Sequence, residues 1–197
     1  MKGLYSGGFQ IATLPNLLSI TRLFLVLPLY PFLKDSRVFL TTLFLILIVL
    51  SDILDGYFAR KFHLENPLGK ILDHGVDKVV SMSISYIFYK FSLLPVWAFW
   101  FFFLRDLLIL LVGGVLYFGF RVAFGSLWLG KIAGIFYFGM FFALLLGFEH
   151  LGKLMMIISV FLFTIVIIVY PIKFYPVLKK RFLAVKEGQS EKILHFI

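Results

Sequence analysis

Residues 51–78 read SDILDGYFARKFHLENPLGKILDHGVDK and carry four aspartates at helical spacing. Asp52 and Asp55 are three positions apart, and Asp73 and Asp77 are four positions apart. Residues at these separations share one face of an α-helix, so each pair presents two carboxylates in the same direction. The spacing therefore predicts two helices, each with an acidic patch near one end.

A short connection containing Asn66-Pro67 separates the two acidic pairs. Because proline disfavours helix at the residue before it, the chain is expected to turn back here. We therefore expect the two helices to be antiparallel neighbours, with all four carboxylates gathered in one place.

The composition indicates that lipid surrounds most of the chain. Hydrophobic residues make up 61% of the 197 residues, and the mean hydropathy is +1.02. A soluble domain is about 45–50% apolar, so a core of this size could not hide the excess. The formal net charge is +9, but the basic residues lie mainly between and after the apolar runs, which favours anionic lipid headgroups over nucleic acid. The chain has no cysteine, which excludes disulfides, thiolate metal sites and a cysteine nucleophile.

Six segments are long and apolar enough for a bilayer core, which takes about 20 residues per helix. We expect spans at Leu14–Leu33, Val38–Arg60, Lys70–Phe91, Val96–Phe118, Leu127–Gly147 and Leu154–Val177. The predicted fold is an all-α, six-helix transmembrane bundle with a polar pocket that faces the cytoplasm. One domain covers residues 1–197, with an interfacial segment at 1–13 and a basic tail at 178–197.

The basic residues in the predicted loops are distributed unevenly between the two sides of the membrane. With the N-terminus inside, the outer side would hold only Lys34, Arg37, Lys90 and Lys153. The inner side would hold Lys2, Arg60, Lys61, Lys70, Arg121, Lys179, Lys180, Arg181, Lys186 and Lys192. Basic loops stay in the cytoplasm, so we expect both termini and the acidic site on the cytoplasmic side of the cell membrane.

Four carboxylates near hydrocarbon require compensation by positive charge. Like-charge repulsion would force some of them to bind protons, and each charge near lipid costs several kcal/mol. An all-carboxylate set suits Mg²⁺ or Mn²⁺ rather than zinc, and two such ions about 3.5–4 Å apart clamp a reacting phosphoryl group. We therefore predict a site for two divalent ions at Asp52, Asp55, Asp73 and Asp77.

Three small residues and one arginine accompany the acids. Gly56 and Ala59 lie on the helix face near the first acidic pair, and Gly69 lies one turn before Asp73. Such gaps would let a flat nucleotide base approach two helix backbones closely. Arg60 adds a fixed charge whose donor fork suits a pyrophosphate.

Other classes of protein also place acids in membrane helices. The acids could pair with Arg22, Lys78 or Arg105, or line the path of an ion or proton carrier, but neither reading requires the small residues beside them. Prenyl transferases also use aspartates with magnesium, yet their DDxxD cluster is absent from this sequence.

The spacing resembles the signature of the CDP-alcohol phosphatidyltransferase family, with no departure at any motif position. The matching pattern is Asp52-x2-Asp55-Gly56-x2-Ala59-Arg60-x8-Gly69-x3-Asp73-x3-Asp77. The resemblance implies an enzyme of phospholipid synthesis that transfers the phosphatidyl group of CDP-diacylglycerol to a small polar alcohol and releases CMP. A second copy of the chain is a further candidate partner.

The resemblance also implies a role for each signature position. Asp52, Asp55 and Asp73 would hold metal, and Asp77 would be a shared metal ligand and the general base that activates the acceptor hydroxyl. The small residues would accommodate cytidine and the arginine would contact the pyrophosphate; these are Gly56, Ala59, Gly69 and Arg60.

Features outside the signature are less specific. Residues 14–22 resemble the opening of the family's first helix, which would place Asn16 and Arg22 near the nucleotide, although Pro15 equally fits an ordinary helix start. Arg105-Asp106 resembles an Arg-acid pair of the family or is a satisfied internal pair. Lys131 follows a glycine, as in many relatives, or extends to the headgroups.

The acceptor alcohol is best predicted as sn-glycerol 3-phosphate. Lys78 directly follows the last acid, as in branches that use phosphorylated acceptors, and Arg105, Arg121 and Lys131 could bind such a phosphate. The Lys-x-Lys-Thr element of typical glycerophosphate enzymes is missing, because the chain reads Lys-Ile-Ala-Gly at 131–134. Inositol phosphate, inositol and serine therefore remain alternatives.

Overall fold

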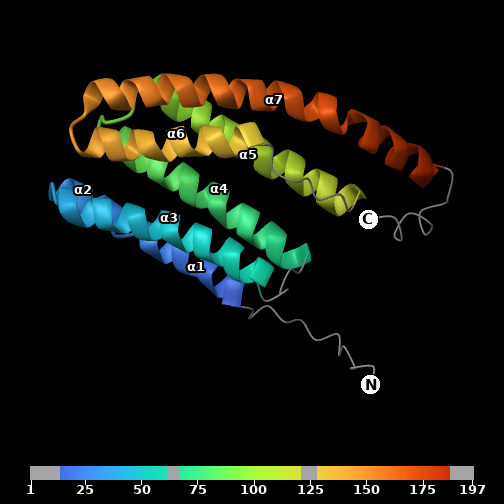
Figure 1. Cartoon of the computed structure of the whole chain (residues 1–197), viewed down its shortest axis with the longest axis horizontal. Helices are drawn as coiled ribbons and strands as arrows, with labels where there is room; N and C mark the ends of the chain where they lie inside the picture. The colour runs from blue at the N-terminus through green and yellow to red at the C-terminus, as the bar shows by residue number, and fades with distance from the viewer. Residues whose placement is uncertain (1–13, 62–66, 121–127, 187–197) are drawn as a thin grey trace. The chain divides into compact units, whose positions relative to one another are not determined.

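The computed structural model describes residues 14–61, 67–120 and 128–186, which form helices joined by short turns and contain no strand. The helices are α1 (Leu14–Val26), α2 (Leu29–Lys34), α3 (Val38–Lys61), α4 (Pro67–Lys90), α5 (Val96–Phe120), α6 (Trp128–Leu145) and α7 (Glu149–Lys186) (Figure 1). The predicted all-α class is confirmed. The predicted interfacial segment at 1–13 lies outside the described residues, as do residues 187–197 of the predicted tail at 178–197, whose first part belongs to α7.

The chain divides into two compact units, one up to Leu110 and one from Leu111 onward. In the first unit, α1 packs against both α3 and α4, and the short α2 contacts these three helices. The sequence predicted that the two acid-bearing helices, α3 and α4, would be direct neighbours. In the described part of the chain α1 links them, because its side chains contact Asp52 of α3 and Asp73 and Asp77 of α4.

The core of the first unit follows the helical periodicity of α4. Val80, Ile84 and Phe88 recur every four residues and are buried, as expected for one apolar face of a helix. Ser81 and Ser85 are buried on the same helix. Small polar side chains of this kind allow close approach of helices in a membrane and supply hydrogen bonds there.

The first predicted span is broken into two helices at Leu27-Pro28. Pro28 stands at the start of α2 with φ −69° and ψ −16°, and Pro31 follows within that helix. Proline lacks a backbone N–H and disfavours helix at the preceding residue. The prediction of one continuous helix over 14–33 was therefore wrong, since two prolines so close together interrupt it.

Three helices end in the same hydrogen-bonded turn. After α6, the N–H of Phe148 donates to Ala143 O at 2.9 Å and that of Gly147 donates to Leu144 O at 3.2 Å. Gly147 has φ +81°, so this is a Schellman turn. The ends of α2 and α4 repeat the pattern, with Ser36 (φ 55°) and Ser92 (φ 58°) in the left-handed position.

The second unit contains α6 and α7 packed along each other. The helices approach closely at Gly152, where an added Cβ would lie 2.6 Å from Leu144 Cδ2. The α7 helix continues to Lys186, although the sequence predicted an end at Val177. Prolines at 171 and 176 remove individual hydrogen bonds, but the residues that follow them are mostly good helix formers and extend the helix.

Three described helices are long and apolar enough to cross a membrane. These spans are Val96–Gly114, Trp128–Leu145 and Glu149–Ile172, and Val38–Leu54 is a shorter apolar helix. The apolar part of α7 is mostly exposed, with Ile157, Phe161, Ile168 and Ile172 on its surface. Exposed apolar surface of this extent indicates lipid contact, so the chain is a helical membrane protein. The predicted number of six spans stays a prediction.

Candidate active site

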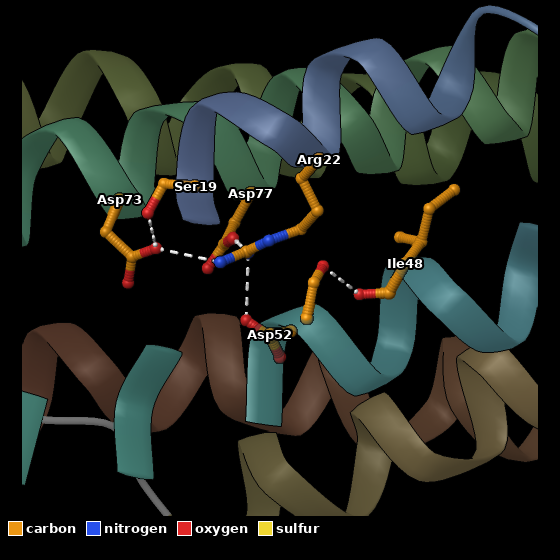
Figure 2. Close-up of polar contacts among 7 residues, drawn as sticks. Ser19, Arg22, Ile48, Asp52, Asp73 and Asp77 are labelled. Atoms are coloured by element: carbon orange, nitrogen blue, oxygen red, sulfur yellow. Dashed lines mark hydrogen bonds and ion pairs between the residues drawn. The ribbon is translucent and has the colours of Figure 1, made fainter. Parts of the chain in front are cut away.

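Three of the four signature aspartates lie around one arginine of α1. Figure 2 shows Asp52 of α3 on one side of Arg22 and Asp73 and Asp77 of α4 on the other. The helix spacing that predicted two acidic faces thus places these three carboxylates together. Asp55 lies on α3, but its side chain is outside the described part.

The guanidinium of Arg22 contacts all three carboxylates. Its Nη1 donates to Asp52 Oδ1 at 2.9 Å and its Nη2 donates to Asp73 Oδ1 at 3.1 Å. Nη1 also pairs with Asp77 Oδ1. The hydroxyl of Ser19, one turn earlier in α1, donates to Asp73 Oδ1 at 2.9 Å. We call these five residues the acid cluster.

In the acid cluster the basic residue, Arg22, is buried, whereas the three aspartates are partly exposed. The side chain of Arg22 is 2% exposed, whereas those of Asp52, Asp73 and Asp77 are 51%, 39% and 29% exposed. A cation or a phosphate-bound cation approaching from outside would therefore meet carboxylate oxygens before it met the guanidinium. Asp52 of α3 is the most exposed of the three acids.

The chemistry of the donors fits a hard divalent cation. The described side chains contribute three carboxylates against one guanidinium, an all-oxygen set with excess negative charge, which suits Mg²⁺ or Mn²⁺. Among the described residues, no group of three His, Cys, Asp or Glu side chains is arranged as a ready metal site. In this conformation the guanidinium lies among the oxygens that a cation would use.

The remaining signature residues belong to the same two helices. Gly56, Ala59 and Arg60 lie in α3 and Gly69 lies in α4, but their side chains are outside the described part. Their predicted contacts with the nucleotide and pyrophosphate stay predictions.

A second polar cluster lies between α4 and α5, directly after Asp77. Asp106 is completely buried; its Oδ2 accepts a hydrogen bond from Ser81 Oγ at 2.6 Å. Its Oδ1 accepts from Arg105 Nε at 2.9 Å and from Nη2 at 2.6 Å, and Lys78 Nζ lies 3.6 Å from the same oxygen. We call these four residues the α4–α5 cluster.

The α4–α5 cluster bears on the predicted acceptor-binding residues. Arg105 is buried and hydrogen-bonded to its neighbour Asp106, which is the internal pair that the sequence left as an alternative. Lys131 is exposed near the start of α6 in the second unit. Arg121 lies outside the described residues, and Asn16 lies in α1 without a described side chain. The acceptor-binding roles of these residues stay predictions.

Two contributions to the clusters were not assigned from the sequence. Ser19 lies within residues 14–22, which resemble the family's first helix, but it received no role, and Asp106 was not expected to bind Lys78 and Ser81. A signal for the second was present, since an acid inside the apolar run of α5 must find partners. Ser19 carries no comparable signal because serine is common in membrane helices.

Comparison with known proteins agrees with the signature and with the helical architecture. The model of the CDP-alcohol phosphatidyltransferase family matches residues 12–166. This match includes both clusters and most of the described helices, and the chain therefore belongs to that family.

A particular relative is also similar in sequence. It is the CDP-diacylglycerol–glycerol-3-phosphate 3-phosphatidyltransferase of Aquifex aeolicus (strain VF5), which is 41% identical over 105 residues. The aligned region covers 51% of this chain and 57% of the relative. The chain thus spans little more than half the length of the relative that it matches.

Proposed function

We propose that the chain transfers the phosphatidyl group of CDP-diacylglycerol to sn-glycerol 3-phosphate and releases CMP. The observation that carries the proposal is the gathering of Asp52, Asp73 and Asp77 at one accessible site. Membership of the family supports the reaction class, and it leaves the ion-carrier and prenyl-transferase alternatives without support.

Asp52, Asp55, Asp73 and Asp77 would hold two divalent ions. Bound there, the ions would neutralise the acids and the pyrophosphate oxygens and would stabilise the charge that develops on the phosphoryl group. The donor set fits such ions, and the excess of acid over base in the described cluster supports their presence.

The protein's own groups would then orient the reactants and move one proton. Asp77 accepts the proton of the acceptor hydroxyl while the oxygen of that hydroxyl forms a bond to the lipid-linked phosphorus. The bond from that phosphorus to the bridging oxygen breaks, and CMP leaves. Arg60 would contact the pyrophosphate, and the small residues Gly56, Ala59 and Gly69 would leave room for the cytidine.

The choice of acceptor rests on charge and on the relative. The printed name of the Aquifex relative includes glycerol 3-phosphate. A phosphorylated alcohol needs bases beyond those that serve the pyrophosphate, and Lys78, 20% exposed beside the acid cluster, and Lys131 are placed in helices that could supply them. The sequence at 131–134 departs from typical glycerophosphate enzymes, so the acceptor must be tested directly.

The proposed orientation places both termini and the acid cluster in the cytoplasm. It rests on the excess of Lys and Arg on that side of the predicted loops. Glycerol 3-phosphate is a charged, water-soluble molecule, and a cytoplasmic opening would give it direct access.

The decisive experiment is CMP release from CDP-diacylglycerol by the purified protein with a panel of alcohols. We expect release with glycerol 3-phosphate and Mg²⁺ or Mn²⁺, no release in EDTA, and recovery when metal is returned. Unchanged release in chelator would contradict the metal site. Faster release with serine, inositol or inositol phosphate would contradict the acceptor alone.

A further inference from the structure

The acid cluster contains its own positive charge. Arg22 contacts the same three carboxylates that the proposed function assigns to metal binding (Figure 2). We propose that Arg22 is a positioning residue that holds Asp52, Asp73 and Asp77 together in the metal-free protein and competes with a divalent cation for them. This inference rests on the proposed function, because it requires that the acids bind metal.

The buried guanidinium of Arg22 and the three carboxylates depend on each other. Charges in a partly buried site are screened much less than in water, so three nearby carboxylates repel one another strongly. A guanidinium offers five donors in a rigid fork and can bridge several carboxylates at once. Arg22 is itself buried, and a buried charge without partners is strongly destabilising. Each side of the cluster therefore holds the other in place.

Ser19 holds one of the acids, Asp73, by a hydrogen bond from an uncharged group. Its hydroxyl donates to Asp73 Oδ1, the oxygen that also accepts from Arg22 Nη2. Ser19 and Arg22 are three residues apart on α1, so they lie on one face of that helix. This face of α1 is thus shaped to receive the carboxylate of Asp73.

A divalent ion and Arg22 would compete for the same carboxylates. A divalent ion bound to these carboxylates would lie within a few ångströms of the guanidinium, and the two positive charges would repel each other. Metal binding and the Arg22 contacts therefore oppose one another. Arg22 would keep the acids assembled when the ion is absent and would weaken the binding of the ion when it is present.

The test compares Arg22→Met and Arg22→Lys with the wild-type protein in detergent. Methionine keeps an unbranched apolar stem without the charge, whereas lysine keeps the charge without the fork. Arg37→Met is a matched control, because Arg37 is 59% exposed and lies 3.8 Å from Asp35, outside the acid cluster. The readouts are the midpoint of thermal unfolding in EDTA and in Mg²⁺, and Mn²⁺ binding by electron paramagnetic resonance.

We expect Arg22→Met to unfold at a lower temperature than wild type in EDTA and to gain more from added Mg²⁺. It should bind Mn²⁺ at least about tenfold more tightly, since a repulsion of even 1.4 kcal/mol corresponds to that factor. Arg22→Lys should lie between the two, and Arg37→Met should match wild type. Equal unfolding in EDTA, or equal or weaker Mn²⁺ binding by Arg22→Met, overturns the proposal.

Arg22→Lys decides the question if the methionine variant does not fold. Its loss of stability in EDTA should be recovered by Mg²⁺, whereas a loss that metal does not recover would make Arg22 an ordinary structural residue and overturn the proposal. CMP release by the wild-type protein is measured in parallel. Absence of that activity would refute the proposed function. If the wild-type protein is active and the Arg22 variants match it in thermal midpoint and Mn²⁺ binding, only the present inference is refuted.

Discussion

The acid cluster and the α4–α5 cluster are adjacent along α4, yet they have opposite excess charge. Among the described side chains, the first combines three carboxylates with Arg22, and the second combines Lys78 and Arg105 with one carboxylate, Asp106. The acids of the first are partly exposed, whereas the acid of the second is completely buried.

This difference indicates that the two clusters have different roles, one in the reaction and one in helix packing. An accessible cluster with excess negative charge can bind and release a cation. A closed cluster whose central acid is paired is instead suited to hold α4 against α5. Variants in the first should therefore affect turnover and metal dependence, and variants in the second should affect folding first.

The largest effect is expected from Asp77→Asn. Loss of the general base should lower turnover by about 10²–10⁴-fold, the usual range for acid–base catalysis, with CDP-lipid binding preserved better than in Asp52→Asn. The measurement is CMP release together with equilibrium binding of the CDP-lipid. Asp35→Asn is the control, since Asp35 is exposed and outside both clusters. Near-normal turnover of Asp77→Asn would remove this residue from the mechanism.

The next effect tests the α4–α5 cluster. Asp106→Asn leaves Arg105 and Lys78 without their buried partner, and breaking a buried ion pair costs about 3–5 kcal/mol. The thermal midpoint in detergent should fall markedly. Replacing both members of the Arg105–Asp106 pair, Asp106→Leu with Arg105→Met, should recover part of the loss, because only Lys78, which is 20% exposed, then lacks its carboxylate partner. An Asp106→Asn protein that unfolds like wild type would show that this cluster does not hold the helices.

A smaller effect is expected from Lys131→Ala. One charge-assisted hydrogen bond to a phosphate contributes about 1.5–3 kcal/mol, so the KM for glycerol 3-phosphate should rise roughly ten- to a hundredfold. The KM for CDP-diacylglycerol should change little. Lys153→Ala serves as the control, because Lys153 is exposed and pairs with Glu149. An unmoved acceptor KM would confine acceptor recognition to other bases.

The smallest effect is expected at the end of α4, in a residue that belongs to neither cluster. Ser92 has φ 58°, a left-handed conformation that costs a non-glycine residue roughly 1–2 kcal/mol. Ser92→Gly should therefore stabilise the protein by about 0.5–1 kcal/mol after the entropy of glycine is subtracted. Ser83→Gly, inside α4, should instead destabilise the protein, because glycine is unfavourable within a helix. A lower midpoint for Ser92→Gly would contradict this account.

The sequence predicted the parts of the fold and site that depend on local spacing. The i, i+4 spacing of Asp73 and Asp77 predicted the acidic face of α4, and the apolar runs predicted most of the described helices. The break at Pro28 was missed because membrane helices tolerate proline when neighbours satisfy the backbone. Tolerance and interruption cannot be told apart from the residue alone.

Long-range partners could not be predicted in the same way. Arg22 is 30 residues from Asp52 and 51 residues from Asp73 along the chain, and no periodicity connects such positions. Arg22, Lys78 and Arg105 were equally plausible partners for the acids. The packing of α1 against both α3 and α4 selects Arg22, and it leaves the other two bases with Asp106.

The tight turn after α6 has a consequence for how the protein lies in its membrane. Three residues, 146–148, join α6 to α7 and reach at most about 11 Å, far less than the roughly 30 Å of a bilayer core. The adjoining ends of the two spans must therefore emerge on one face, and the start of α6, with Lys131, must lie toward the other. Because the chain contains no cysteine, His150→Cys would be its sole thiol. Labelling of that thiol by an impermeant reagent from outside the cell would orient both spans at once and place Lys131 toward the cytoplasm.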